Sequence, residues 1–86
     1  MMREIDREQQ QAMMERVESI IQLHKYQYED IRDELLAMGF IAKQDNPGFA
    51  LWENPDHEIF VLIRMKPEQE YESHQVVTFE DMEGLE

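Results

Sequence analysis

Apolar residues recur every three or four positions across residues 3–38, which is the spacing that places them on one face of an α-helix. This stretch has no Gly or Pro and is rich in residues that favour helices. Gly39 then follows where a left-handed residue commonly ends a helix, and Phe40 is placed to fold back on Leu35 or Leu36. We therefore expect one helix over residues 3–38, with a break near Lys25–Tyr28 as the alternative. The apolar seam of this helix comprises Met14, Val17, Ile21, His24, Tyr28, Ile31, Leu35 and Met38.

After Gly39 the pattern changes to short runs with the two-residue period of strands. Pro47 and Gly48 fit the two central positions of a type II turn, and a second turn is expected at Asn54–His57. A helix followed by a meander predicts an α+β fold, with one long N-terminal helix packed on a three- to four-stranded antiparallel sheet. We expect one domain over residues 1–79 and an acidic flexible tail over residues 80–86. The predicted strands are about 40–44, 49–53, 58–66 and 75–79.

Two mismatches in this plan suggest self-association. A helix of 36 residues spans about 54 Å, whereas a strand of five to nine residues spans only about 17–30 Å. The third strand also has apolar residues on both faces, and one helix covers only one face. We expect a homodimer formed through the N-terminal helix, the bare sheet face, or both; a monomer whose helix folds back across the second face is the alternative. The residues assigned to self-association are Met14, Val17, Ile21, His24 and Tyr28.

Charge is the strongest functional signal. Twenty Asp and Glu oppose eight Lys and Arg, for a net charge of −12. Residues 67–86 contribute seven acids and no base, and in an extended segment the alternation of Glu68, Glu70 and Glu72 puts three carboxylates on one side. Such a chain is repelled by nucleic acid and anionic membranes and attracted to basic partners, although the acids could equally serve solubility. The predicted partner-binding residues are Glu68, Glu70, Glu72, Glu80, Asp81 and Glu83.

Candidate chemistry is sparse. Asp56-His57-Glu58 invites a metal interpretation, but three consecutive residues rarely converge on one ion, and no metal-binding motif is present. Ser73 beside His74 has no triad geometry, and the isolated glycines form no phosphate-binding loop. His24 is either a hydrogen-bonded core residue or a pH-sensitive element. We expect no metal, no cofactor and no enzymatic activity.

The absence of cysteine fits a reducing compartment. The N-terminus has no apolar core of a signal peptide, and the longest apolar run is far short of the roughly 20 residues that span a bilayer. We therefore expect a cytoplasmic protein. The aromatic and apolar residues of the second and third strands have two interpretations: they fill the core, or Trp52, Phe60 and Leu62 serve as anchors in a protein interface.

The order of a helix, the segment Leu35-Leu36-x-Met38-Gly39-Phe40 and three strands resembles the start of HicA-type RNA-cleaving toxins, which have a small double-stranded-RNA-binding-like fold. The resemblance covers residues 30–65. That family places Gly-Ser-His on the second strand, where this chain has Pro47-Gly48-Phe49-Ala50 without a histidine. The family's basic surface and second helix are missing as well. The resemblance therefore implies architecture alone, and RNA cleavage does not carry over.

Three functions remain open from the sequence. The favoured one is a non-enzymatic acidic module that binds a basic protein surface, in the manner of nucleic-acid-mimicking inhibitors, antitoxins and phage-encoded inhibitors of host defence. The second is a structural or regulatory homodimer whose acids only keep it soluble. The third is a small metal-assisted hydrolase that uses His57 and His74.

Overall fold

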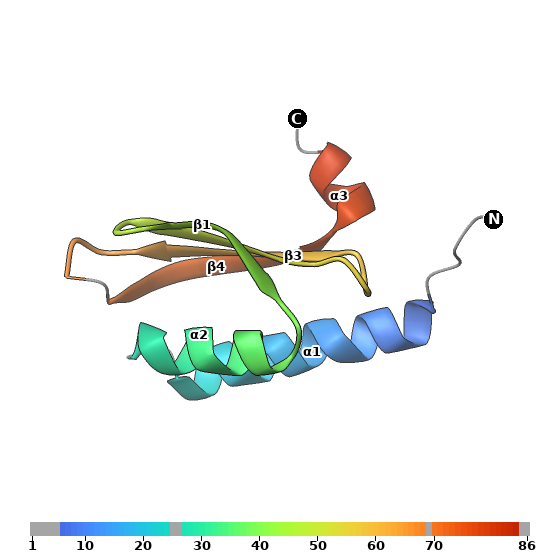
Figure 1. Cartoon of the computed structure of the whole chain (residues 1–86), viewed down its shortest axis with the longest axis horizontal. Coiled ribbons are helices and arrows are strands. Elements are labelled where there is room, and N and C mark those ends of the chain that lie inside the picture. Colours follow the sequence, from blue (N-terminus) through green and yellow to red (C-terminus); the bar gives the residue numbers. More distant parts are fainter. Residues whose placement is uncertain (1–5, 25–26, 69, 85–86) are drawn as a thin grey trace.

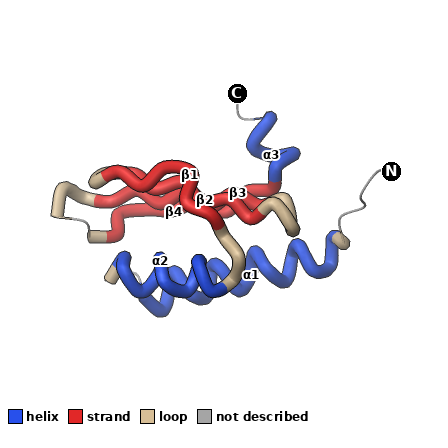
Figure 2. Tube along the Cα trace, viewed as in Figure 1, coloured by secondary structure: helices blue, strands red, loops and turns tan. Residues whose placement is uncertain are grey.

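The protein consists of a helical layer and a four-stranded sheet. The computed structural model describes residues 6–24, 27–68 and 70–84. Residues 82–84 are described by their backbone alone. Two helices lie beneath the sheet and a short third helix stands on its other side (Figure 1). Figure 2 shows the helices and strands in separate layers, which confirms the α+β fold. The elements are α1 (Arg7–His24), α2 (Tyr28–Ala37), β1 (Ile41–Asn46), β2 (Phe49–Asn54), β3 (Ile59–Met65), β4 (Tyr71–Thr78) and α3 (Phe79–Gly84).

The segment predicted as one continuous helix forms two helices, α1 and α2. Gln27 is extended, with φ −137° and ψ 91°, and its N–H donates to the carbonyl oxygen of His24 at 2.8 Å. The seven residues of β3 span only about 23 Å. A straight helix would therefore carry half of its apolar seam past the sheet, whereas folding back buries both halves on the same sheet face. The prediction of a continuous helix is wrong, and the alternative break near Lys25–Tyr28 is confirmed.

Gly39 ends α2 as predicted. Its φ is +89°, a conformation that L side chains rarely adopt. The Gly39 N–H donates to the carbonyl oxygen of Leu36 at 3.1 Å and the Phe40 N–H to that of Leu35 at 3.0 Å, which together form a Schellman motif. Phe40 is buried in the same cluster as Leu35. This cap fixes the direction in which the chain leaves the helical layer and enters β1.

The hydrophobic core lies between the helical layer and one face of the sheet. Trp52 is 1 % exposed and belongs to this core, so it is not available as an interface anchor. Alternate residues of β2 and β3 face the helices, and the burial of both strands follows the two-residue period. The core cluster consists of Val17, Ile21, Tyr28, Ile31, Leu35, Phe40, Ala50, Trp52, Ile59, Val61, Ile63 and Met65.

The sheet is an antiparallel meander in the order β1-β2-β3-β4. Each edge strand has a register shift. In β1 the shift lies between Ala42 and Gln44, so Lys43 is the extra residue; in β4 it leaves Glu72 extra between Tyr71 and Ser73. Both edges thus carry a bulge with a charged residue, a device that opposes pairing with a further strand.

Two predictions about the loops and one about the C-terminal segment need correction. The turn between β1 and β2 is at Pro47-Gly48 as predicted, but a type II turn requires positive φ at the second central residue and Gly48 does not have it. The acidic segment predicted as a loop over residues 68–74 is shorter, because β4 already begins at Tyr71. Phe79–Gly84 are helical, whereas the sequence predicted a flexible tail from residue 80; residues 85–86 lie outside the described residues.

Candidate functional site

The sheet face opposite α1 and α2, here called the open face, is the largest part of the sheet that the two long helices leave uncovered. Strand register places Phe49 opposite Arg64, Leu51 opposite Leu62 and Glu53 opposite Phe60 on this face. Phe49, Leu51, Phe60 and Leu62, here called the apolar stripe, are half-buried along the two central strands. Gln44 and Gln75, the partners of Leu51 and Leu62 on the outer strands, flank the stripe.

Helix α3 covers one end of the open face. The Phe79 ring stacks on the Phe60 ring with centroids 4.6 Å apart. The Phe79 N–H donates to the carbonyl oxygen of Glu58 at 2.9 Å, which ties the start of α3 to the β2–β3 turn. Val77, which pairs with Phe60 in register, is only 6 % exposed. The chain therefore covers the Phe60 end of the stripe itself, and Phe49, Leu51 and Leu62 lie beyond α3.

The acids predicted to bind a partner occupy both ends of the open face. Glu68 and Glu70 are exposed in the β3–β4 connection, where the Lys66 N–H donates to the carbonyl oxygen of Glu70 at 2.8 Å. Because this bond closes a turn and Glu72 is the extra residue of a bulge, these three acids do not form the single extended row that the sequence suggested. Glu80 and Asp81 are exposed in the first turn of α3; the side chain of Glu83 lies outside the described residues.

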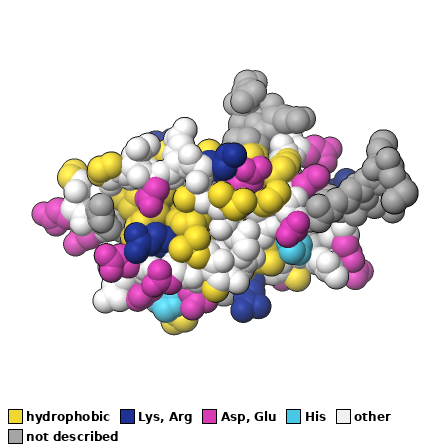
Figure 3. Space-filling view, in the orientation of Figure 1, with side chains coloured by type: hydrophobic (Ala, Val, Ile, Leu, Met, Phe, Trp, Pro, Cys, Tyr) yellow, Lys and Arg dark blue, Asp and Glu magenta, His cyan; other side chains and the backbone are white. Residues whose placement is uncertain are grey.

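In the view of Figure 3, Asp and Glu side chains lie at both ends of the elongated molecule and also near its middle, among apolar side chains. One end carries the β3–β4 turn and the start of α2, which has Glu29 and Asp30 in its first turn. The other end carries α3 and the start of α1, where Arg7 and Glu80 form a long, exposed ion pair at 3.8 Å. The open face thus lies between two acidic ends.

Three of the five residues predicted for self-association, Val17, Ile21 and Tyr28, belong to the core within the chain. Val17 and Ile21 are 0 % exposed and Tyr28 is 7 % exposed, beneath the sheet of the same chain. Met14 packs against this cluster, and His24 is half-buried at the end of α1. Val17, Ile21 and Tyr28 are therefore covered by the sheet of their own chain, and self-association through them stays a prediction.

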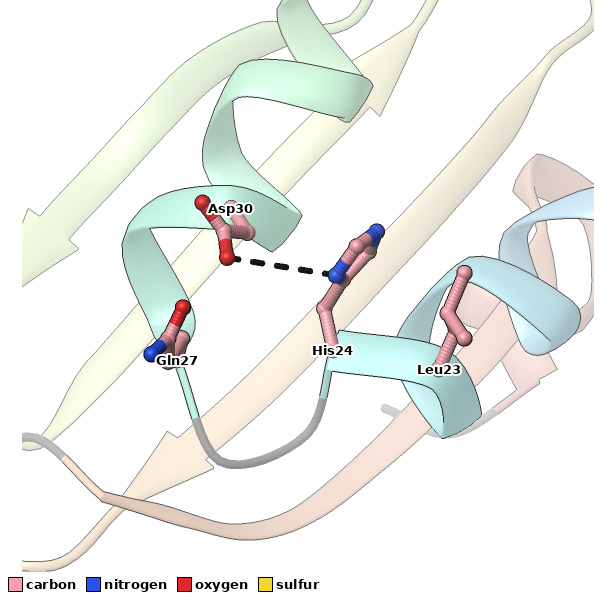
Figure 4. A pocket seen from close by; sticks show the side chains of 4 residues that line it. All are labelled: Leu23, His24, Gln27 and Asp30. Atoms are coloured by element: carbon pink, nitrogen blue, oxygen red, sulfur yellow. Dashed lines mark ion pairs between the residues drawn. The ribbon is translucent and has the colours of Figure 1, made fainter.

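A small hollow of about 150 Å³ lies at the corner between α1 and α2, lined by Leu23, His24, Gln27 and Asp30 (Figure 4). His24 Nδ1 faces Asp30 Oδ2 across the corner at 3.9 Å. Leu23 is 76 % exposed at its rim. One imidazole and one carboxylate at this separation form a weak link between the two helices rather than a centre with chemistry of its own.

His74 is the centre of a three-residue hydrogen-bonded chain. Its Nε2 lies 2.7 Å from Glu18 Oε2 and its Nδ1 lies 2.6 Å from the Tyr71 hydroxyl. Since a carboxylate only accepts, Nε2 donates to Glu18, and in the neutral ring Nδ1 accepts from Tyr71. Burial and the charge of Glu18 raise the pKa of the Tyr71 hydroxyl, so this chain holds a neutral phenol and does not activate it as a nucleophile.

No local sequence pattern indicates the hydrogen bonds that connect Tyr71, His74 and Glu18. Residues three apart in a regular strand face opposite sides, but the extra Glu72 brings Tyr71 and His74 onto the same, helix-facing side. Their third partner, Glu18, is 56 residues away from His74 in the chain. These hydrogen bonds link the edge strand β4 to α1.

A second set of hydrogen bonds links α2 to the sheet. The Trp52 Nε1–H donates to the Tyr28 hydroxyl at 3.2 Å, and the Tyr28 hydroxyl donates to Asp45 Oδ1 at 3.2 Å. Burial raises the pKa of Tyr28 to about 12, and the charge of Asp45 adds to this effect. The geometry satisfies a buried indole and a buried phenol, and its role is structural.

The two histidines of the hydrolase hypothesis lie apart. The His57 N–H and Nδ1 both contact Asn54 Oδ1, and the nearly buried Asn54 donates to the carbonyl oxygen of Met38. His74 pairs with Ile63, whereas His57 lies beyond Ile59 at the end of β3, about 13 Å or more further along the strand. Among the described residues no group of three His, Asp or Glu side chains is arranged to hold a metal ion.

No family model, no curated protein and no solved structure matches the chain. Within the described part of the chain, no helix has both the length and the apolar character needed to cross a membrane.

Proposed function

We propose that this protein is a small, non-enzymatic acidic module that binds a basic surface of another protein. The observation that carries the proposal is the placement of the acids. Of the 17 acids whose side chains are described, 14 are exposed and three are half-buried, so the whole surplus acts at the surface. Such a surface attracts a basic partner and accelerates the encounter with it.

Exposed acids lie at both ends of the molecule in addition to those that pair with described Lys or Arg side chains. Among the described side chains, Arg7 pairs with Glu80, and Lys43 pairs with Glu53 at 3.3 Å. A partner that presents Lys and Arg therefore finds free carboxylates at both ends of the molecule. A basic groove that normally holds nucleic acid has this chemistry, which makes nucleic-acid-binding proteins and nucleases the preferred class of partner. The absence of cysteine supports a cytoplasmic setting as part of the proposal.

A pull-down with the immobilised protein, followed by mass spectrometry, tests this proposal. In 50 mM NaCl we expect enrichment of basic proteins, and loss of these proteins in 500 mM NaCl, because salt screens exposed charges. Added duplex DNA should displace a partner that uses its nucleic-acid groove. Enrichment without a basic bias, unchanged by salt, would contradict the proposal.

Charge-matched variants test which acids bind. The triple variant Glu68→Gln, Glu70→Gln, Glu72→Gln should weaken capture of the basic partner. Its control, Glu15→Gln, Asp33→Asn, Glu34→Gln, also removes three charges but on exposed positions of α1 and α2. Equal weakening by both variants would show that net charge alone acts, and would overturn the assignment to the ends of the open face.

Self-association through the open face is the second candidate, and the apolar stripe is the observation that favours it. The charge of −12 on each copy opposes it. Sedimentation velocity at micromolar concentration decides the question: a dimer that Leu62→Gln converts to a monomer would establish this candidate.

A further inference from the structure

The apolar stripe has the dimensions of a site for one helix. It runs along two neighbouring strands, and strands about 4.8 Å apart give it a width of about 10 Å, close to the diameter of an α-helix with its side chains. Leu62 lies two residues, or about 7 Å, from Phe60 on β3, and Arg64 continues the same face to about 13 Å from Phe60. Between α3 and Arg64 the face therefore has room for about two turns of a helix, which rise about 11 Å.

The chain already covers one end of this face with a helix. Helix α3 places the Phe79 ring against the Phe60 ring and stands on the side of the sheet away from α1 and α2 (Figure 1). This contact shows how the open face accepts a short helix that inserts a large apolar side chain. Phe49, Leu51 and Leu62 remain outside this contact and offer the same kind of surface next to it.

Charge decides what kind of helix fits. Besides the ion pair of Arg7 with Glu80, three bases and five acids lie on or beside the open face, for a net charge of −2. The acids stand mainly at the two ends, in the β3–β4 turn and in α3, while Glu53 on the face is paired with Lys43. A second copy would bring acidic ends towards acidic ends, whereas a basic helix would find carboxylates at both of its ends. The bases are Lys43, Arg64 and Lys66, and the acids are Glu53, Glu68, Glu70, Glu72 and Asp81.

We propose that the open face is a docking site for a basic amphipathic helix of a partner protein, with apolar residues of that helix on Phe49, Leu51 and Leu62 and its Lys and Arg residues directed at the β3–β4 turn and α3. The inference rests on the proposed function, and it adds the binding surface and the partner's structural element. Helix-in-groove recognition of this kind is read through apolar anchors at helical spacing.

The probe for this site is a synthetic peptide of about 14 residues, built from Leu, Lys and Ala with Leu at i, i+3, i+4 and i+7 spacing. Its control is a scrambled peptide of identical composition and charge without an apolar face. Titration into the ¹⁵N-labelled protein should shift the amide signals of β2 and β3 and leave those of the outer helix surfaces unchanged. We expect the amphipathic peptide to bind at least tenfold more tightly than the scrambled one.

Two protein variants locate the contact. Leu62→Gln replaces a residue of the apolar stripe with glutamine, the residue that already stands beside it at Gln75. This substitution should lower the affinity for the amphipathic peptide about tenfold. Leu23→Gln changes an exposed leucine of the helical layer and should leave binding unchanged. Circular dichroism and thermal unfolding test whether both variants are folded. If Leu62→Gln is not folded, Leu51→Gln serves as the second variant of the apolar stripe.

The outcomes separate this inference from the proposed function. Equal, salt-sensitive binding of both peptides would overturn the docking site while leaving charge-driven binding in place. Binding of neither peptide would overturn the docking site, and the pull-down would then decide the proposed function by itself. A dimer in sedimentation that Leu62→Gln dissociates would assign the open face to a second copy and also overturn the inference.

Discussion

Two tyrosine hydroxyls connect the helical layer to the sheet, each through a different set of partners. Tyr28 on α2 reaches Asp45 on β1 and Trp52 on β2. Tyr71 on β4 reaches Glu18 on α1 through His74. Among the described residues no buried side-chain nitrogen or oxygen lacks a hydrogen-bond partner. These contacts therefore fix the relative position of the layers without leaving a polar group unsatisfied, which would cost free energy.

The titration of Tyr28 should appear in the pH dependence of stability. Burial raises its pKa to about 12 in the folded protein, whereas an unfolded tyrosine titrates near 10. Between pH 10 and 12 the Tyr28 hydroxyl therefore keeps its proton in the folded state and loses it in the unfolded state. This contribution to stability is complete below pH 10 and is lost as the pH rises from 10 to 12. Urea unfolding at pH 9, 10 and 11 measures it, and Tyr28→Phe should show a shallower decline; an equally steep decline in this variant would contradict the assignment.

The His74 chain should stabilise the attachment of β4 to α1. The His74 side chain is 10 % exposed and bonds to a carboxylate, and such bonds contribute about 1.5–3 kcal/mol. His74→Ala should lower the free energy of unfolding by an amount of this order. A double-mutant cycle with Glu18→Ala, measured by urea unfolding at pH 7, should give a coupling of at least about 0.5 kcal/mol. Glu15→Ala, on the same helix, is the control and should show no coupling to His74→Ala.

At the scale of elements, the helix boundaries show what sequence reasoning can and cannot reach. The end of α2 could be predicted because Gly39 carries a local signal that the fold preserves. The break before α2 has no Gly or Pro, and its cause is the length of the sheet beneath it, which local pattern does not encode. The faces of β2 and β3 followed from alternation alone, but α3 did not, because a six-residue segment with three acids favours no structure until Phe79 packs on Phe60.

The candidate site was predicted only in part for the same reason. Alternation put Phe60 and Leu62 on one face of the third strand and Ile59, Val61 and Ile63 on the other, and this division is confirmed. The positions of Glu68 and Glu70 relative to Glu72 depend on a turn and a bulge, and both arise from pairing with β3. The apolar seam of the helices was identified correctly, and the hairpin of α1 and α2 lets one sheet cover it.

The start of α2 offers a test at this scale. Gln27 is the N-cap residue, and its side chain makes no capping hydrogen bond. Gln27→Ser supplies a hydroxyl that can accept from the N–H groups of the first turn, so the free energy of unfolding should rise by about 0.5–1 kcal/mol. Gln22→Ser is the matched control, because the same substitution inside α1 only loses helix propensity. A stabilisation in both variants, or in neither, would contradict the N-cap assignment.

For the molecule as a whole, the charge of −12 on 86 residues is a cost to the folded state. Like charges on a compact surface repel one another, and exposed pairs are screened over about 10 Å at 0.1 M salt. The unfolding temperature should therefore rise between 10 mM and 200 mM NaCl at pH 7. Differential scanning calorimetry measures the change, and the triple variant at Glu68, Glu70 and Glu72 should show a smaller one. An unfolding temperature that falls with salt would mean that favourable ion pairs outweigh the repulsion.

The bulges at Lys43 and Glu72 have a consequence for aggregation. An open sheet with four strands has two exposed edges, and regular edges are templates on which further chains add strands until fibres form. Here an incoming strand would meet, on either side, a shifted ladder and a charged side chain. Growth by strand addition is opposed at both edges, so this short chain can expose an apolar sheet face to its surroundings and still remain a discrete particle at high concentration.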